Sequence, residues 1–221
     1  MTMPLSNSTD TIMSQPLSEA LREHTAKAHE DAEHSTFIHQ LLKGELDTTA
    51  FIHLQEQSWF FYTALEEAAR SCAPDPRSQE LLDPRLERRK ALVHDLDALH
   101  GNSTWRQHIQ PTAATANYVQ RLMEIAATRD FPRVLAHHYV RYLGDLSGGQ
   151  IIARMMGDHY DISPDALSFY RFEALGKIKP YKDGYRAALD ALNLTAQERD
   201  TLLTEAHEAF IYNQNVFNSL G

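Results

Sequence analysis

Three glycines lie inside one long segment whose apolar residues otherwise recur at helical spacing. Gly144, Gly148 and Gly149 interrupt a stretch in which leucine, isoleucine, methionine and aromatic residues return every three or four positions. Each glycine inside a helix costs about 1 kcal/mol relative to alanine, so the three together cost roughly 3 kcal/mol. Gly144 and Gly148 are one turn apart and bare the same face. That face admits either a neighbouring helix or a flat ligand, and spacing alone favours helix packing slightly.

Composition describes an ordinary globular chain. Its 221 residues, 43% of them hydrophobic, are enough to bury one core. A net charge of -9 argues against general nucleic-acid binding, which needs a basic surface. The single cysteine, Cys72, excludes an internal disulfide and fits a reducing compartment, so we expect a cytoplasmic protein.

The two ends of the chain carry no membrane signal. Residues 1–16 are polar and lack the basic start and apolar run of a secretory signal, so we expect a flexible leader. No stretch approaches the ~20 apolar residues that a membrane helix requires, and the end at Gly221 has no hydrophobic tail. We therefore expect no membrane anchor and a single domain over residues 17–221.

Helical periodicity extends along nearly the whole domain and predicts an all-α fold. The predicted helices are Leu17–Glu33, Phe37–Lys43, Thr48–Cys72, Pro84–His100, Ala113–Thr128, Phe131–His159, Pro164–Phe172, Tyr181–Leu192 and Ala196–Ser219. Thr195 and Glu198 form a capping-box pattern, and Gly44 and Gly101 stand where helices should end. Further breaks are expected at Pro74, Pro76 and Pro111 and from Gly176 to Pro180.

His29 is the most informative of the twelve histidines. It shares one face of the first predicted helix with Arg22, Thr25 and Glu33. A carboxylate one turn from a histidine can fix the tautomer of a metal-binding imidazole and raise its basicity. Taken alone, however, this pattern is more often an exposed His–Glu pair.

A di-iron carboxylate bundle is the alternative metal site for an all-α chain. It requires inward glutamates and a Glu-x-x-His pair on each of two helices. The sequence contains no Glu-x-x-His, and it also lacks a phosphate loop, a His-Glu-x-x-His zinc helix and a Cys-x-x-Cys pair. The motifs therefore disfavour these classes.

Two segments together resemble the haem oxygenases. The segment from Ala136 to Gln150, with its glycines and Asp145, is similar to the family's signature, and Lys27–Phe37 resembles the helix that carries the proximal histidine. Tyr62–Glu67, Tyr181–Arg186 and Phe210–Phe217 follow in the family's order. The likeness runs from about Leu17 to Leu220 and is closest to the soluble bacterial enzymes.

The resemblance implies that haem b lies between the first helix and a distal helix kinked at its glycines. His29 would be the iron ligand, with Glu33 bonded to its other ring nitrogen. Asp145, Arg141 and Tyr62 would hold the water that supplies protons, beside Gly144 and Gly148. A plain salt bridge between Arg141 and Asp145 is the alternative that spacing alone favours.

The resemblance also implies contacts with the rest of the haem. Arg22, Lys182, Arg186 and the Tyr139 hydroxyl would anchor the propionates, although Arg22 replaces the family's usual lysine and changes the geometry of that contact. Further haem contacts are implied for Ser147, Gly149, Phe210, Asn213 and Phe217. For the two phenylalanines, ordinary core packing is the commoner explanation.

The implied activity is oxidative opening of haem to biliverdin, in its IX-alpha form, with carbon monoxide and ferrous iron. Haem would be both cofactor and substrate, dioxygen the oxidant, and a separate reductase or ferredoxin the electron source. We expect a monomer that serves haem degradation and iron release. A haem carrier or sensor with the same fold is the alternative, but it would have no need of Asp145.

Overall fold

The structure, a computed structural model, describes residues 15–221, and within that range the chain forms helices and connecting segments without a strand. The α-helices are α2 Leu17–Glu33, α3 Thr36–Leu42, α4 Thr48–Ser71, α5 Arg89–His100, α6 Ala113–Thr128, α7 Phe131–Tyr160, α8 Ile178–Asp190 and α9 Ala196–Asn218. Short 3-10 helices are η1 Pro76–Ser78, η2 Pro84–Leu86, η3 Trp105–Gln107, η4 Pro164–Tyr170 and η5 Glu173–Leu175. The all-α prediction is confirmed.

The predicted leader lies almost wholly outside the described residues. Of residues 1–16, the structure describes Gln15 and Pro16. The Gln15 carbonyl accepts a hydrogen bond of 2.7 Å from the Arg199 guanidinium on α9.

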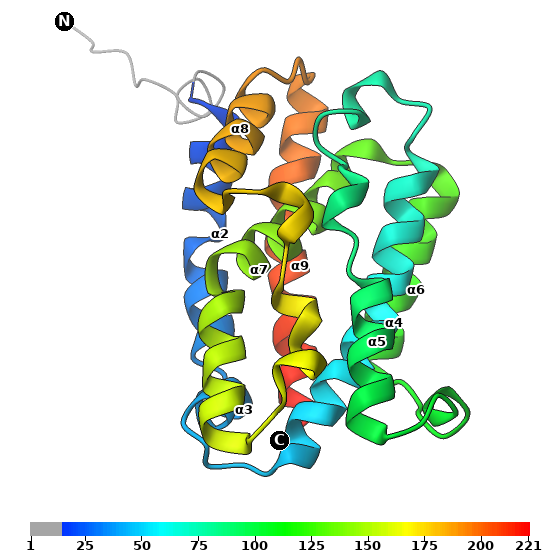
Figure 1. The fold of residues 1–221 in the computed structure, drawn as a ribbon. Helices are drawn as coiled ribbons and strands as arrows, with labels where there is room; N and C mark the ends of the chain where they lie inside the picture. Colours follow the sequence, from blue (N-terminus) through cyan, green and yellow to red (C-terminus); the bar gives the residue numbers. More distant parts are fainter. Residues whose placement is uncertain (1–14) are drawn as a thin grey trace, which may run out of the picture.

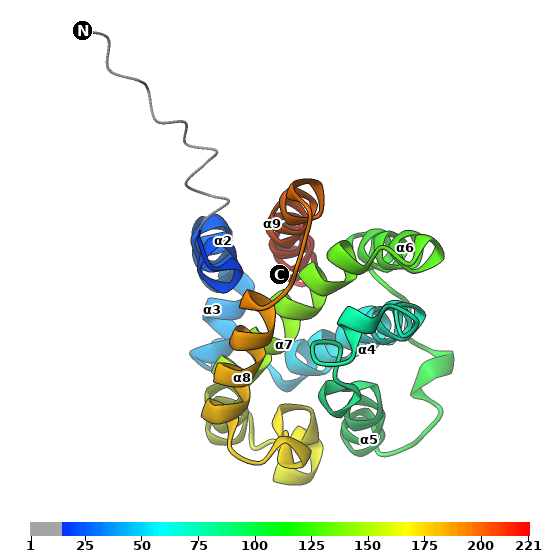
Figure 2. The ribbon, with the colours of Figure 1, turned by 90° about the horizontal axis from the view of Figure 1, so that it is seen from above.

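The helices surround a core to which α4, α7 and α9 contribute most. Helix α9 packs against both α7 and α2, and α4 packs against α6 (Figures 1 and 2). Helix α8 packs against α2 and α7 near one end of the molecule (Figure 1). Figure 1 shows that α7 changes direction near its middle, as expected for a helix with central glycines.

Burial of apolar side chains along these helices accounts for their packing. Tyr62 and Leu65 of α4, Leu135 of α7 and Leu202 of α9 are all fully buried. Each such side chain contributes about 2 kcal/mol relative to an exposed one. Leu96 of α5 forms a smaller buried cluster with Trp105 and Ile109.

Several helices begin or end at the local signals that the sequence predicts. Gly44 and Gly101 have φ of 72° and 67°, the left-handed backbone that favours glycine after a helix. Thr195 and Glu198 form the predicted capping box at the start of α9. These signals work because they are satisfied by residues close in the sequence.

The single helix predicted over Pro84–His100 is wrong, because the chain breaks between η2 and α5. The carboxylate of Glu66, from α4, accepts hydrogen bonds of 2.6 and 2.7 Å from the backbone N–H groups of Arg88 and Arg89. A side chain distant in the sequence thus caps α5 at Arg89, and the preceding turn remains a separate 3-10 helix.

The segment predicted as an α-helix over Pro164–Phe172 is instead the 3-10 helix η4. Ser163 caps its start as expected, but Ala166 and Leu167 depart from helical backbone angles. The Asp95 carboxylate accepts from the N–H groups of Ser168 and Phe169 at 2.9 and 2.7 Å. These tertiary hydrogen bonds replace those of an α-helix.

The predicted break through Pro180 is also wrong, since α8 begins at Ile178 rather than Tyr181. Pro180 lies in the first turn, where backbone N–H groups have no partner within the helix. Proline is therefore tolerated there.

Within residues 15–221, none of the helices is long and apolar enough to cross a membrane. Among the side chains that the structure describes, no group of three or more His, Cys, Asp or Glu is placed to hold a metal ion.

Candidate functional site

A polar cluster joins α4, α7 and α9 at the middle of α7. The hydroxyl of Tyr62 donates a short hydrogen bond to the Asp145 carboxylate. The Arg141 guanidinium donates to the Tyr62 oxygen at 2.8 and 3.1 Å and to Asp145 at 3.3 Å. Its remaining arm donates to Asn213 Oδ1 at 2.8 Å. We call Tyr62, Arg141, Asp145 and Asn213 the Asp145 cluster.

Burial controls the protonation of this cluster. The Arg141 and Asp145 side chains are only 15% and 10% exposed, so they differ from an ordinary surface pair. Burial raises the pKa of Asp145, although the neighbouring Arg141 and the Tyr62 hydrogen bond oppose that rise. Burial likewise raises the pKa of Tyr62 well above its usual value. Asp145 therefore keeps a proton to higher pH than an exposed aspartate, whereas Tyr62 stays a neutral donor.

The three glycines of α7 have different surroundings. A Cβ placed on Gly144 or Gly148 would have nothing within 4 Å, apart from the helix itself. A Cβ on Gly149 would meet the Tyr170 ring at 3.3 Å, and Gly149 is buried. Gly149 thus allows η4 to pack closely, whereas Gly144 and Gly148 leave open space beside the backbone.

His29 projects from α2 toward α9. It is exposed, and its ring lies edge-on to Phe210 with the centroids 5.4 Å apart. The side chain of Glu33, and with it the expected contact with His29, lies outside the described side chains. Phe210 and Phe217 are half-buried and pack against the core.

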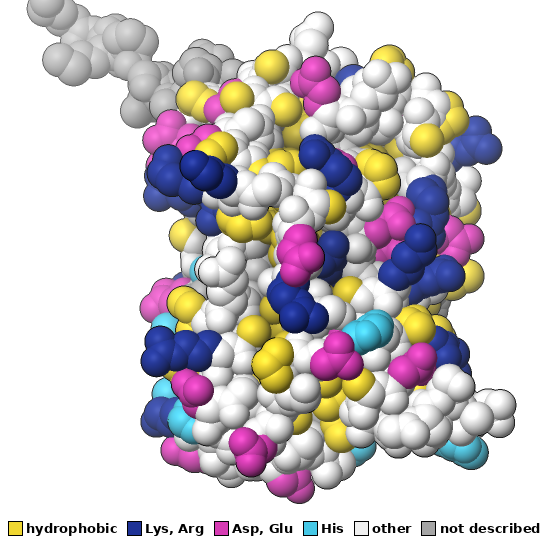
Figure 3. Space-filling view, in the orientation of Figure 1, with side chains coloured by type: hydrophobic (Ala, Val, Ile, Leu, Met, Phe, Trp, Pro, Cys, Tyr) yellow, Lys and Arg dark blue, Asp and Glu magenta, His cyan; other side chains and the backbone are white. Residues whose placement is uncertain are grey.

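Positive side chains from α2 and α8 converge near Tyr139. Burial raises the pKa of Tyr139, and the charges of Arg186 and Arg22 both oppose that rise. Burial and the charge of Arg186 lower the pKa of Lys182, which donates to the Ser147 hydroxyl at 2.8 Å. Figure 3 shows Lys and Arg side chains gathered over α8 and the adjoining part of α2. Cations placed in this way suit an anionic ligand.

Arg22 has local partners as well. It lies 4.0 Å from Glu19 and 3.7 Å from Glu23, and its side chain is 70% exposed. It can leave these weak surface contacts at little cost.

One neighbour of the cluster was not anticipated from the sequence. The Phe61 ring lies beneath the Arg141 guanidinium, with 5.2 Å between the guanidinium carbon and the ring centroid. Phe61 precedes Tyr62 on α4, and nothing in its local sequence distinguishes it from an ordinary core residue.

Fold and side chains together define an all-α protein with a helix bared at two glycines, a buried acid beside them and cations nearby. This arrangement fits a flat anionic ligand.

The comparisons with known proteins agree with this class. A family model described as Heme oxygenase matches residues 15–219. Heme oxygenase 1 from Synechocystis is 35% identical over 94% of this chain and 86% of its own length, and Heme oxygenase 1 from Bos taurus is 36% identical over 96% and 73%. The crystal structure of the Synechocystis heme oxygenase-1 in complex with heme has a TM-score of 0.87 at 34% identity, covering 93% and 92% of the two chains. The chain therefore belongs to the heme oxygenase family.

Proposed function

We propose that the protein is a haem oxygenase, which opens the haem ring oxidatively to biliverdin, carbon monoxide and ferrous iron. Haem b is then both cofactor and substrate. The observation that carries the proposal is the buried pair of Arg141 and Asp145 on α7, the same helix that carries two glycines with open space beside them. The family to which the chain belongs supports it.

The residues on α7 fit a flat ring. Since neither Gly144 nor Gly148 has an atom where a Cβ would point, a planar ligand can approach the helix backbone. Gly149 serves η4 instead, through its contact with Tyr170. Gly144 and Gly148 thus form the distal wall of the proposed site.

His29 supplies the proximal ligand. A neutral imidazole is a common haem iron ligand, and His29 is exposed on α2, against Phe210. Glu33 is one turn further along α2, a spacing that allows it to bond the second ring nitrogen. Phe210 and Phe217 line the α9 side.

Four side chains orient the ring through its propionates. Arg22, Lys182 and Arg186 supply positive charge. The charges of Arg22 and Arg186 also act on the pKa of the Tyr139 hydroxyl. Ser147, which accepts from Lys182, lies on α7 beside Gly148. These groups fix which edge of the ring faces the Asp145 cluster.

When bound, haem supplies the iron that activates dioxygen and the meso carbon that becomes oxidised. Asp145 holds a proton-donating water near Gly144 and Gly148, and burial raises the pKa of its carboxyl above the usual range, which favours a group that gives and takes protons. Arg141 fixes both Tyr62 and Asp145, and Asn213 fixes Arg141. Since the two glycines carry no acid or base, this water delivers the protons in the proposed mechanism.

The remaining requirements come from outside the chain. We propose that electrons arrive from a separate reductase or ferredoxin and that dioxygen is the oxidant. We further propose a monomeric, cytoplasmic protein that degrades haem and releases iron.

One experiment separates this enzyme from a carrier or sensor. Hemin is bound to the protein, a chemical reductant is added in air with catalase present, and the Soret band is followed. We expect the band to disappear and biliverdin to accumulate, while hemin without protein gives none. A stable Soret band under these conditions would contradict the proposed activity. Catalase matters because free peroxide can degrade haem without the site.

A further inference from the structure

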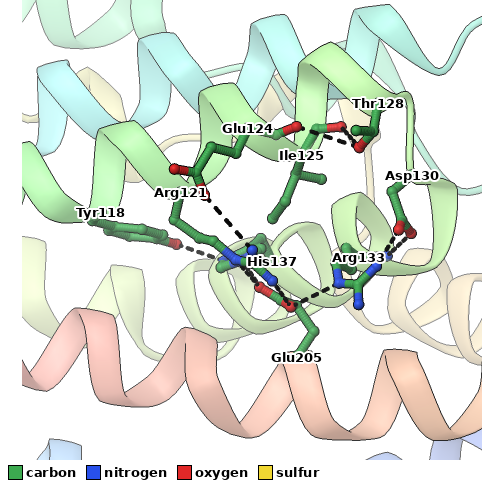
Figure 4. Close-up of polar contacts among 9 residues, drawn as sticks. All are labelled: Tyr118, Arg121, Glu124, Ile125, Thr128, Asp130, Arg133, His137 and Glu205. Carbon is green, nitrogen blue, oxygen red and sulfur yellow. Dashed lines mark hydrogen bonds and ion pairs between the residues drawn. The ribbon is translucent and has the colours of Figure 1, made fainter.

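We propose that a second buried cluster, centred on Glu205, positions Arg141 and thereby the Asp145 cluster. It consists of Tyr118, Arg121, Arg133, His137 and Glu205, from α6, α7 and α9 (Figure 4). These are positioning residues, and the inference rests on the proposed function for its effect on turnover. We call this group the Glu205 cluster.

Glu205 is the hub of this cluster. Its carboxylate accepts from Arg121 at 2.9 and 2.5 Å and from His137 Nε2 at 3.0 Å, and Arg133 Nε lies 3.3 Å away. Its side chain is only 5% exposed. Figure 4 shows the three donors approaching the carboxylate from α6 and α7, which ties both helices to α9.

The protonation states in the cluster are fixed by these contacts. Hydrogen bonds from His137 and Arg121 lower the pKa of Glu205 to about 2 against the effect of burial, whereas burial lowers the pKa of His137. A carboxylate facing a neutral imidazole requires the proton on Nε2. Nδ1 of His137 must then accept, and the Tyr118 hydroxyl donates to it at 3.2 Å.

Two routes lead from this cluster to Arg141. His137 is one helical turn before Arg141 on α7, so fixing His137 fixes that turn. Tyr118, held by His137, stacks on Phe61 with centroids 5.3 Å apart. Phe61 in turn lies beneath the Arg141 guanidinium. Arg141 is therefore set by its own helix and by the ring on which it rests.

Stability alone does not account for such a cluster. Replacing a buried ion cluster by apolar residues of similar volume is often neutral or stabilising, so buried charge is weak evidence for stability. Directional hydrogen bonds do fix helix position more narrowly than apolar contacts. The Glu205 cluster lies where α6, α7 and α9 meet, next to the turn that carries Arg141.

The first test uses Glu205→Gln, with Glu198→Gln as the matched control. Glu198 is also on α9 and binds an arginine, Arg77, at 2.8 Å, and glutamine preserves its capping box. In haem-free protein we expect the Arg141 Nε–H and Asp145 carboxyl NMR signals to shift in Glu205→Gln and to remain in place in Glu198→Gln. Unmoved signals in a folded Glu205→Gln protein would overturn the proposal.

A milder variant keeps the test valid if Glu205→Gln does not fold. Tyr118→Phe keeps the ring on Phe61 but removes its bond to His137. We expect a smaller shift of the Arg141 Nε–H signal in the same direction as the shift that His137→Asn produces. If the Arg141 Nε–H signal stays in place in both Tyr118→Phe and His137→Asn, the route through Tyr118 and Phe61 is wrong, and so is the positioning role of the Glu205 cluster.

The second test measures whether the position of Arg141 affects haem turnover. With hemin and reductant, Glu205→Gln should form biliverdin about fivefold more slowly, with haem affinity unchanged within about twofold. An equal loss of affinity would indicate general destabilisation and overturn the proposal. If the wild-type protein formed no biliverdin, the proposed function would fail, while the haem-free NMR comparison would still decide whether Glu205 positions Arg141.

Discussion

His29 on α2 and Asp145 on α7, the two residues that would face haem from opposite sides, have opposite surroundings. His29 is exposed and rests edge-on against Phe210. The Asp145 side chain is 10% exposed and is bonded to Tyr62 and Arg141, which are themselves held by α4 and α9. The α2 side thus offers an exposed imidazole, whereas the α7 side offers a buried carboxyl held by hydrogen bonds.

This difference matches the two tasks. An iron ligand must be reached by a ring that enters from solvent. A proton-delivering carboxyl must instead hold one geometry, because proton transfer depends on hydrogen-bond distance. Variants of His29 should therefore change haem binding, and variants of Asp145 should change what happens to bound haem.

The largest expected effect belongs to the α2 side. His29→Ala should abolish turnover and change the haem spectrum, because we assign His29 as the iron ligand. Added imidazole should restore part of both, since it can fill the space left by the side chain. The control is His24→Ala, another exposed histidine on α2. An unchanged spectrum and rate in His29→Ala would remove the assignment.

The cations near α8 should affect product identity more than rate. In a double variant, Lys182→Ala with Arg186→Ala, the ring loses two of its anchors and should rotate, giving mixed biliverdin isomers in place of mainly the IX-alpha form. Lys179→Ala is the control, since Lys179 is also an exposed cation on α8 and, like Arg186, pairs with Asp183, yet no shift of the Tyr139 pKa is attributed to it. Chromatography of the products distinguishes the isomers. A single unchanged isomer would exclude the two residues as anchors.

Acid should weaken the hydrogen bonds of the Glu205 cluster. The pKa of Glu205 falls from 4.5 to about 2 on folding, so its contribution is present above pH 4.5 and is lost as pH falls toward 2. Glu205→Gln should be less stable at neutral pH by on the order of 2 kcal/mol and should approach the wild type near pH 2. Urea unfolding at several pH values tests this. The control Glu23→Gln, which removes an exposed pair with Arg22, should follow the wild-type curve.

The smallest expected effect is a difference in stability between alanine variants on two faces of α7. Gly144→Ala should stabilise haem-free protein by up to about 1 kcal/mol, because alanine favours helix and its Cβ meets nothing within 4 Å. Gly149→Ala should gain less or lose, since Tyr170 lies 3.3 Å from the added atom. Haem affinity should fall only in Gly144→Ala. Equal stability changes would contradict the assigned roles of the two glycines.

Local signals made much of the fold predictable. Helices α2 and α6 begin and end at the predicted residues, and the capping box lies at the start of α9. Two of the errors fall where a carboxylate distant in sequence binds backbone N–H groups, as Glu66 does before α5 and Asp95 does in η4. Such caps cannot be found from spacing, because the acid and the helix it shapes are far apart in the chain.

In the site, too, contacts between residues close in sequence were predictable and contacts between distant residues were not. Arg141 and Asp145 are four residues apart, so their contact was predictable from helix geometry. Tyr62 and Asn213 joined the site only through the family resemblance, since they are 79 and 72 residues from Arg141. The contact of Glu205 with His137 spans 68 residues and was not anticipated. Nor did the sequence separate Gly149 from Gly144, because only the position of Tyr170 distinguishes them.

The most direct test of the account is Asp145→Ala, with Asp145→Asn beside it, measuring haem affinity and biliverdin formation in the same samples. We expect haem affinity in Asp145→Ala to stay within about twofold, because His29 and the cations remain, while biliverdin formation falls about 100-fold with loss of the ordered water. Asp145→Asn should retain part of the activity if its amide still holds that water. Biliverdin formation at the wild-type rate in Asp145→Ala would contradict the account and leave Asp145 as a structural partner of Arg141.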